Sequence, residues 1–151
     1  MDNRFEVTVG AGPMMSPSST AVRFPHPWTD AGVTVEADFT GGHVLHLAVA
    51  GCVLNDVYRE AAALGIVVKG VRVSAAGGFD TATWQSTGID YSVEVSSDAP
   101  ADQLAHLLAV VDQVAEIPQT IRAGAPRPTD YLIGPESCAS PRWSSTVLWM
   151  S

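Results

Sequence analysis

A long apolar stretch in the first half of the chain is the strongest pattern in the sequence. Nearly every side chain from Val44 to Leu54 is small or apolar, and charged residues interleave with apolar ones after Asn55. Gly65 supplies the stop expected at a helix C-terminus. Because a helix that is apolar all round is normally buried, we predict a central helix within His46 to Ile66. Its apolar run is shorter than the about 20 residues that a bilayer span needs, so no membrane partner is predicted.

Alternation of apolar and polar residues predicts strands on both sides of this helix. The two segments that follow the helix are joined by a loop around Gly77 to Gly88. The predicted strands are Phe5 to Val9, Val33 to Phe39, residues 66–75 and residues 88–97, with a short strand possible at Thr20 to Phe24.

A second helix follows the last strand. Asp98 is its expected N-cap, and Pro100 is expected in its first turn. Apolar residues recur at helical spacing and predict a core face; they are Leu104, Leu107, Leu108, Val111 and Ala115. We therefore predict an α+β domain over residues 1–124. The tail of residues 125–151 is irregular but contains apolar residues such as Trp143 and Trp149, so it should pack on the domain or on a partner subunit.

Composition and charge limit the classes of function. The 151 residues, 46% of them hydrophobic and 16% charged, predict one globular domain. A formal net charge of -8 without any basic run argues against a nucleic-acid partner. No signal peptide is expected and the two cysteines lie far apart, which predicts reduced thiols and a cytoplasmic location. Pro13 interrupts the only glycine-rich loop, and no cofactor is predicted.

Cys52 lies inside the predicted central helix, and its residue type alone leaves its role open. A free cysteine usually behaves as a small buried hydrophobe. Asn55 and Asp56 share its helical face, and a neighbouring carboxylate raises a thiol pKa, which disfavours the reactive thiolate. Arg59 returns to the same face, where it could offset Asp56 or simply pair with it.

Two longer segments resemble the OsmC/Ohr family in the order and spacing of their motifs. The segment GGHVLHLAVAGCVLNDVYREAAALGIVVKGVRVSAAGGFD has a glycine turn, a buried helix with a cysteine after Ala-Gly, and a following V-x-V strand. The segment GIDYSVEVSSDAPADQLAHLLAVVDQVAEIPQTIRAG is similar to the family's next strand, second helix and closing segment. The resemblance covers Gly41 to Gly124. It implies an OsmC-like fold with N-terminal antiparallel strands, assembled as an intertwined homodimer with the site at the subunit interface.

The resemblance also implies a chemistry, because family members are thiol-dependent peroxidases of organic hydroperoxides. Cys52 would then be the attacking thiol, and Arg23 is the candidate for the family's thiolate-stabilising arginine. Two features differ from the family. Ile117 stands before Pro118 where a resolving cysteine is usual, and Gly42 stands where many members have a glutamate.

Two functions therefore remain open at this point. The first is a peroxidase in which an external thiol regenerates Cys52 after attack on an apolar hydroperoxide. The second is a repurposed scaffold that binds a hydrophobic small molecule, or also catalyses a non-redox step of secondary metabolism on it. The missing resolving thiol and carboxylate favour the second function, whereas Cys52 itself favours the first.

Further candidate residues could line a substrate pocket near the central helix. His43 and His46 lie one turn apart, but no H-E-x-x-H motif or third ligand accompanies them, so no metal site is predicted. Trp28, in the sequence FPHPWTD, could line an apolar pocket. Together with Asp56, these residues are the predicted substrate-binding side chains.

Cys138 is the second cysteine and lies in the tail, in the sequence ESCASP. It is either an incidental loop residue or a displaced resolving thiol. No evident constraint holds it near Cys52, so we expect no disulfide between the two.

Overall fold

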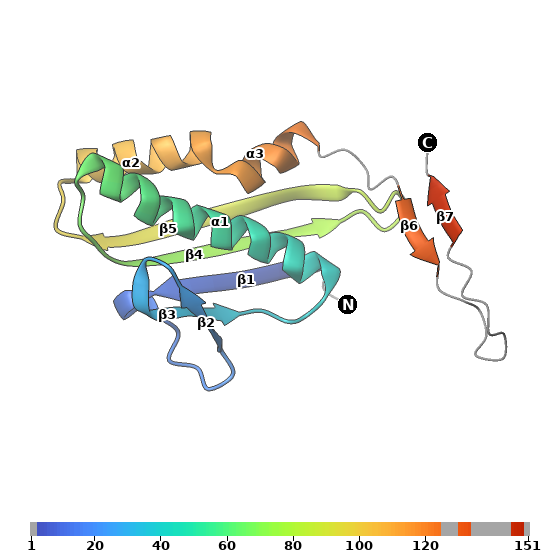
Figure 1. Cartoon of the computed structure of the whole chain (residues 1–151), viewed down its shortest axis with the longest axis horizontal. Coiled ribbons are helices and arrows are strands. Elements are labelled where there is room, and N and C mark those ends of the chain that lie inside the picture. The colour runs from blue at the N-terminus through green and yellow to red at the C-terminus, as the bar shows by residue number, and fades with distance from the viewer. Residues whose placement is uncertain (1–2, 125–129, 134–145, 150–151) are drawn as a thin grey trace.

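A five-stranded antiparallel sheet carries the helices on one face (Figure 1). This computed structural model describes residues 3–124, 130–133 and 146–149. The strand order is β2-β3-β1-β4-β5, so that β2 and β5 form the edges. The strands are β1 Arg4–Ala11, β2 Val22–His26, β3 Thr29–Glu36, β4 Val68–Phe79 and β5 Ser86–Ser97. The helices are α1 Gly41–Leu64, α2 Ala101–Val114 and α3 Glu116–Ala123, with a 3-10 turn at Gly12–Met14.

The α+β class and the order of the elements are confirmed. Two further short strands, β6 Asp130–Ile133 and β7 Thr146–Trp149, pair with each other in a separate antiparallel sheet. The packing of the tail stays a prediction. No helix within the described ranges is long and apolar enough to cross a membrane.

The predicted central helix is α1, and its ends have clear local causes. Thr40 is the N-cap, and its hydroxyl oxygen accepts a hydrogen bond from the backbone N–H of His43. Gly65 is the C-cap with a φ of 70°, which a residue without Cβ adopts without strain. The helix begins at Gly41, earlier than predicted, so Gly41 and Gly42 belong to its first turn and not to a preceding turn.

One face of α1 packs across β1 and β4 and forms the centre of the core. Successive side chains of a strand point to opposite faces of the sheet, and the valines of β1 and β4 recur at every second position, so that one face of the sheet is apolar and meets the helix. The buried contributors from α1 are Val49, Ala50, Val53, Leu54, Val57 and Ala61, and those from β1 and β4 include Val7, Val9, Val71 and Val73.

Burial of α1 on all sides, as predicted from its sequence, is not found within one chain. Val44 is 42% exposed, Ala48 is exposed, and Cys52 is half-buried. The reason is that the sheet and α2 cover only part of the helix circumference, and the remaining strip faces outward. The homodimer that would cover this strip remains a prediction.

The start of the second helix differs from the prediction. Helix α2 begins at Ala101 with Pro100 at the N-cap position, and Asp98 caps nothing. The carboxylate of Asp98 instead pairs with Lys69 of β4, at 2.6 Å from Nζ, and the hydroxyl of Ser97 accepts from the N–H of Ala99. The predicted core face of α2 is confirmed, with Leu107 and Val111 fully buried.

The hairpin between β4 and β5 is longer than predicted, and its glycines explain how it approaches α1. Residues 77–79 and 86–88 are strand, and the loop is confined to residues 80–85. A Cβ placed on Gly77 would lie 2.2 Å from the backbone oxygen of Gly88 and 2.6 Å from Nε2 of His46. Gly77 thus lets the end of β4 touch both β5 and α1.

Substituting Gly77 by alanine should destabilise the protein, because the added methyl group meets backbone that cannot move away. We expect a loss of about 1–3 kcal/mol in the free energy of unfolding, measured by urea titration. Gly51→Ala is the matched control: a Cβ there meets nothing within 4 Å, and the change should stabilise α1 by about 0.5–1 kcal/mol. Equal effects of the two substitutions would contradict this packing.

Candidate functional site

Cys52 lies on the outward side of α1, where the first residue of α3 approaches it. Its Sγ atom is 3.8 Å from Oδ2 of Asp56, one turn further along the same helix. It is 3.7 Å from Oε2 of Glu116, which begins α3. The geometry places the thiol so that it can donate to either carboxylate, and the Cys52 residue is half-buried.

The start of α3 lies next to the sulfur, and the backbone N–H of Ile117 lowers the pKa of the Cys52 thiol. The first N–H groups of a helix have no partner inside the helix and carry partial positive charge. Pro118, which could not donate inside a helix, sits in this first turn, where no donor is needed.

Helix α3 is held in place by a polar cluster at its far end. The hydroxyl of Tyr91 on β5 donates to Asp112 of α2, and Arg122 of α3 binds the same carboxylate at 2.8 Å. Gln119 adds hydrogen bonds from α3 to the backbone carbonyls at the end of α2. These contacts fix where Glu116 and Ile117 lie relative to α1.

A guanidinium group completes the cluster around Cys52. Nη1 of Arg59 is 2.9 Å from Oδ1 of Asp56 and 3.8 Å from Oε2 of Glu116, and its Nε is 2.9 Å from Glu60. The Asp56 side chain is only 4% exposed, whereas Arg59 is 43% exposed. Arg59 therefore pairs with Asp56, one of the two roles expected for it.

The pKa values in this cluster depend first on burial. Burial, with a further contribution from Glu116, raises the pKa of Asp56 from 3.8 to about 6 against the opposing effect of Arg59. Burial also raises the pKa of the Cys52 thiol, the N–H of Ile117 lowers it, and the two carboxylates raise it. The backbone N–H of Glu116 holds the pKa of that exposed carboxyl below its usual value. A thiol, a titrating Asp56 and an ionised Glu116 thus coexist near neutral pH.

These three side chains are also the one described group whose spacing would suit a metal ion, since their ligand atoms lie within 4.8 Å of one another. Arg59 already supplies a positive charge at Asp56, so a cation would compete with the guanidinium. We assign no metal to this site. What the arrangement can do is move a proton between a thiol and a carboxylate.

The other predicted site residues lie elsewhere in the chain. Arg23 is on the edge strand β2, and its Nη1 donates to the carbonyl of Ala31 at 3.1 Å. Within the described residues of one chain, the guanidinium beside Cys52 belongs to Arg59 and not to Arg23. Cys138 lies outside the described residues.

His43 and His46 join an aromatic cluster at the N-terminal end of α1 and do not contact Cys52 in any described interaction. Both rings pack against Phe5, and His46 also meets Phe79. Nδ1 of the buried His46 lies 2.6 Å from the carbonyl oxygen of Gly42, so this nitrogen carries the proton. Both rings thus contribute to packing at the start of α1, and their predicted role in substrate binding stays a prediction.

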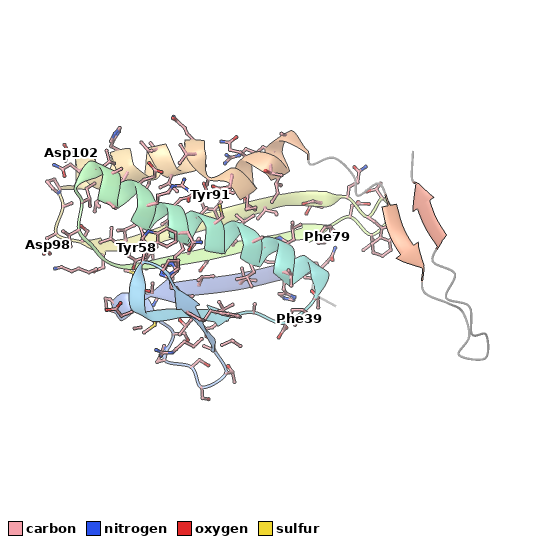
Figure 2. All side chains as sticks on the ribbon, in the orientation of Figure 1. Phe39, Tyr58, Phe79, Tyr91, Asp98 and Asp102 are labelled. Atoms are coloured by element: carbon pink, nitrogen blue, oxygen red, sulfur yellow. The ribbon has the colours of Figure 1, made fainter. Side chains whose placement is uncertain are left out.

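His26 was missed at the level of sequence, and it connects β2 to α1 near Cys52. Its Nε2 lies 3.0 Å from Oδ1 of Asn55, and its ring meets the edge of Tyr58 at 5.6 Å. Tyr58 lies on the side of α1 that faces β2 (Figure 2). Trp28, 44% exposed, stacks obliquely on His26 and does not close a pocket around Cys52. No motif around His26 indicated this contact.

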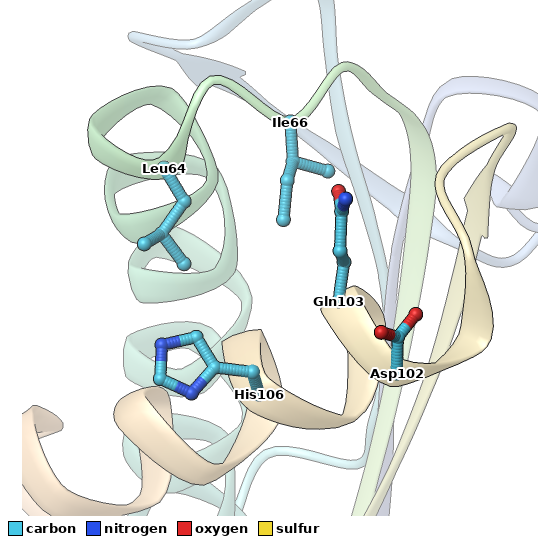
Figure 3. Close-up of a pocket in the computed structure, with 5 residues that line it drawn as sticks. All are labelled: Leu64, Ile66, Asp102, Gln103 and His106. Atoms are coloured by element: carbon cyan, nitrogen blue, oxygen red, sulfur yellow. The ribbon is translucent and has the colours of Figure 1, made fainter.

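A small open pocket of about 310 Å3 lies between the end of α1 and the start of α2 (Figure 3). Leu64 and Ile66 form its apolar wall, and Asp102, Gln103 and His106 form the polar side. Cys52 does not line it. The predicted substrate pocket is therefore distinct from this one.

Comparison with known proteins shows the family of the chain. The sequence profile of the OsmC-like proteins matches residues 34–130. The chain belongs to the OsmC-like family. The structure is similar to the crystal structure of an OsmC-like hydroperoxide resistance protein from Jannaschia sp. CCS1, with a TM-score of 0.54 over 95% of this chain and 99% of that chain, at 11% identity. No curated protein matches the chain.

The family resemblance seen in the sequence is thus confirmed, and the OsmC-like fold agrees with the predicted class. The structure also shows where the two residues that differ from the family, Ile117 and Gly42, lie relative to Cys52. Ile117 stands at the position of the usual resolving cysteine, and its backbone N–H lowers the pKa of the Cys52 thiol. Gly42 leaves no carboxylate at the start of α1, whereas Asp56 and Glu116 supply two beside Cys52.

Replacing Asp56 by asparagine should change how stability depends on pH. The pKa of Asp56 is raised by folding, so its contribution to stability is complete below 3.8 and is lost as pH rises through about 6. Asparagine does not titrate. Between pH 4.5 and 7.5 the free energy of unfolding of the wild type should therefore fall relative to Asp56→Asn by on the order of 1–2 kcal/mol. A wild type that gains stability relative to the variant over this range would show that the effect of Arg59 on the pKa of Asp56 outweighs that of burial.

Proposed function

We propose that this OsmC-like protein reduces organic hydroperoxides with Cys52 as the attacking thiol and an external thiol as reductant. The observation that carries the proposal is the surroundings of Cys52: a half-buried thiol, the N–H of Ile117, two carboxylates and an arginine in one cluster. The name of the structural relative, a hydroperoxide resistance protein, supports the same reaction.

The attack is a two-electron transfer. The Cys52 sulfur attacks the outer oxygen of the hydroperoxide, an S–O bond forms, and the O–O bond breaks. The leaving alkoxide takes up a proton and departs as the alcohol, and Cys52 is oxidised to the sulfenic acid. The thiol loses one proton and the alkoxide gains one, so the step has no net uptake or release of protons.

Regeneration requires a thiol from outside the site. Ile117 cannot attack a sulfenic acid, so an external thiol condenses with Cys52, releases water and forms a mixed disulfide. A second external thiol then attacks this disulfide and restores Cys52, and the reductant leaves as its own disulfide.

A second function is favoured by a different observation. Burial and two carboxylates raise the pKa of Cys52, which keeps it in the less nucleophilic thiol form. On this account the scaffold binds a hydrophobic small molecule, with or without a non-redox step, and Cys52 is part of the wall of its site.

The Cys52→Ser variant separates the two functions. If the proposal is right, the wild type consumes cumene hydroperoxide in the presence of dithiothreitol, and Cys52→Ser loses at least about 100-fold of that rate because its hydroxyl is a poor nucleophile. The rate is measured by the loss of hydroperoxide, and circular dichroism establishes that the variant is folded.

Cys138→Ser is the control, because it removes the other thiol and leaves the Cys52 cluster unchanged. It should retain the wild-type rate if the reductant is external. A wild type without hydroperoxide consumption, or a Cys52→Ser variant as active as the wild type, would overturn the peroxidase proposal in favour of ligand handling.

A further inference from the structure

We propose that Asp56 and Glu116 act as a carboxylate pair that carries the proton of the Cys52 reaction. Asp56 accepts the proton of the thiol as the sulfur attacks and returns it to the leaving alkoxide, while Glu116 keeps Asp56 basic enough to accept it. This inference rests on the proposed function, and it assigns the proton step to residues that the family resemblance did not indicate.

The first support is the geometry of the pair. Both carboxylates reach the same sulfur, at 3.8 and 3.7 Å, although they come from helices that are far apart in the sequence. The ligand atoms of all three residues lie within 4.8 Å of one another. A proton leaving the sulfur therefore has a carboxylate oxygen within reach without any rearrangement of the chain.

The second support is the contrast in burial between the two carboxylates. The Asp56 side chain is 4% exposed and is oriented by Arg59, whereas Glu116 is 65% exposed. A buried carboxylate beside a second negative charge holds a proton more readily than one in water, and its pKa of about 6 suits exchange near neutral pH. Asp56 is thus the proton carrier, and Glu116 tunes it.

The charged groups that surround the pair from the packed elements are few. Helix α1 contributes Arg59 and Glu60, which bind each other, and α3 contributes Glu116 itself. On the β2 side, His26 is bound to Asn55. Asp112 of α2 and Arg122 bind each other at the far end of α3 from Glu116.

The proton balance follows from this arrangement. The S–H bond of Cys52 breaks and an O–H bond forms on Asp56; the S–O bond then forms as the O–O bond of the hydroperoxide breaks. The O–H bond of Asp56 breaks when the alkoxide takes the proton and leaves as alcohol. Asp56 ends the step as the carboxylate with which it began.

The test measures thiol reactivity and turnover in the same variants, on a Cys138→Ser background so that Cys52 is the one thiol. Asp56→Asn and Glu116→Gln remove a negative charge beside the sulfur, which should lower the pH midpoint of iodoacetamide alkylation and speed alkylation at pH 7 several-fold. Turnover of cumene hydroperoxide at pH 7 should nevertheless fall at least about 10-fold in Asp56→Asn, because the proton carrier is lost.

Opposite movements of alkylation and turnover are the signature of a proton carrier. Asp98→Asn is the matched control, since it removes one exposed carboxylate that pairs with Lys69 and not with the Cys52 cluster, and it should change neither measurement.

Turnover that rises together with alkylation in Asp56→Asn would overturn the inference, because the carboxylate would then only suppress the thiol. An unshifted alkylation midpoint, or a parallel loss of both rates, would also overturn it while the wild type remains an active peroxidase. A wild type without turnover would instead overturn the proposed function, and the two failures are thereby distinguished.

Discussion

The packing of α1 across β1 and β4 is the interaction on which the rest of the structure depends. Each large side chain that it buries contributes about 1.5–3 kcal/mol relative to exposure, and Val53, Leu54 and Val57 are fully buried. Because these residues pack one face of the helix against the sheet, they also fix the direction in which the opposite face points. Cys52 is consequently turned away from the sheet and toward α3.

The chemistry of the site follows from how α3 meets that outward face. The Tyr91–Asp112–Arg122 cluster anchors α3, so that the N–H of Ile117 and the carboxylate of Glu116 arrive at the sulfur together. The N–H of Ile117 favours the thiolate, whereas the carboxylate of Glu116 opposes it. The balance leaves a protonated thiol with a proton acceptor beside it, which is a different arrangement from a thiolate held by an arginine.

The sequence predicted those parts of the molecule that depend on local periodicity. Helix α1, its end at Gly65 and the core face of α2 were predicted correctly because side-chain spacing alone determines them. Asp98 was wrong as an N-cap because Lys69, distant in sequence, takes its carboxylate. Burial on all sides of α1 was wrong for one chain because a sheet covers only one face of a helix.

The site was predictable only in part, for the same reason. Cys52 and Asp56 share a helical face, so their contact could be expected, whereas Glu116 and His26 reach α1 through the tertiary fold and gave no local signal. Arg23 was chosen from the family resemblance; within one chain it binds its own hairpin, and its role beside Cys52 stays a prediction.

In the proposed cycle, hydroperoxide oxidises Cys52 to the sulfenic acid, and an external thiol then reduces it. The most direct test of this cycle is a non-reducing peptide map after one equivalent of cumene hydroperoxide, with dimedone present to trap sulfenic acid. We expect one dimedone adduct on Cys52 and no Cys52–Cys138 disulfide. A stoichiometric Cys52–Cys138 peptide would contradict the external-thiol cycle, and an unmodified Cys52 would contradict the peroxidase account altogether.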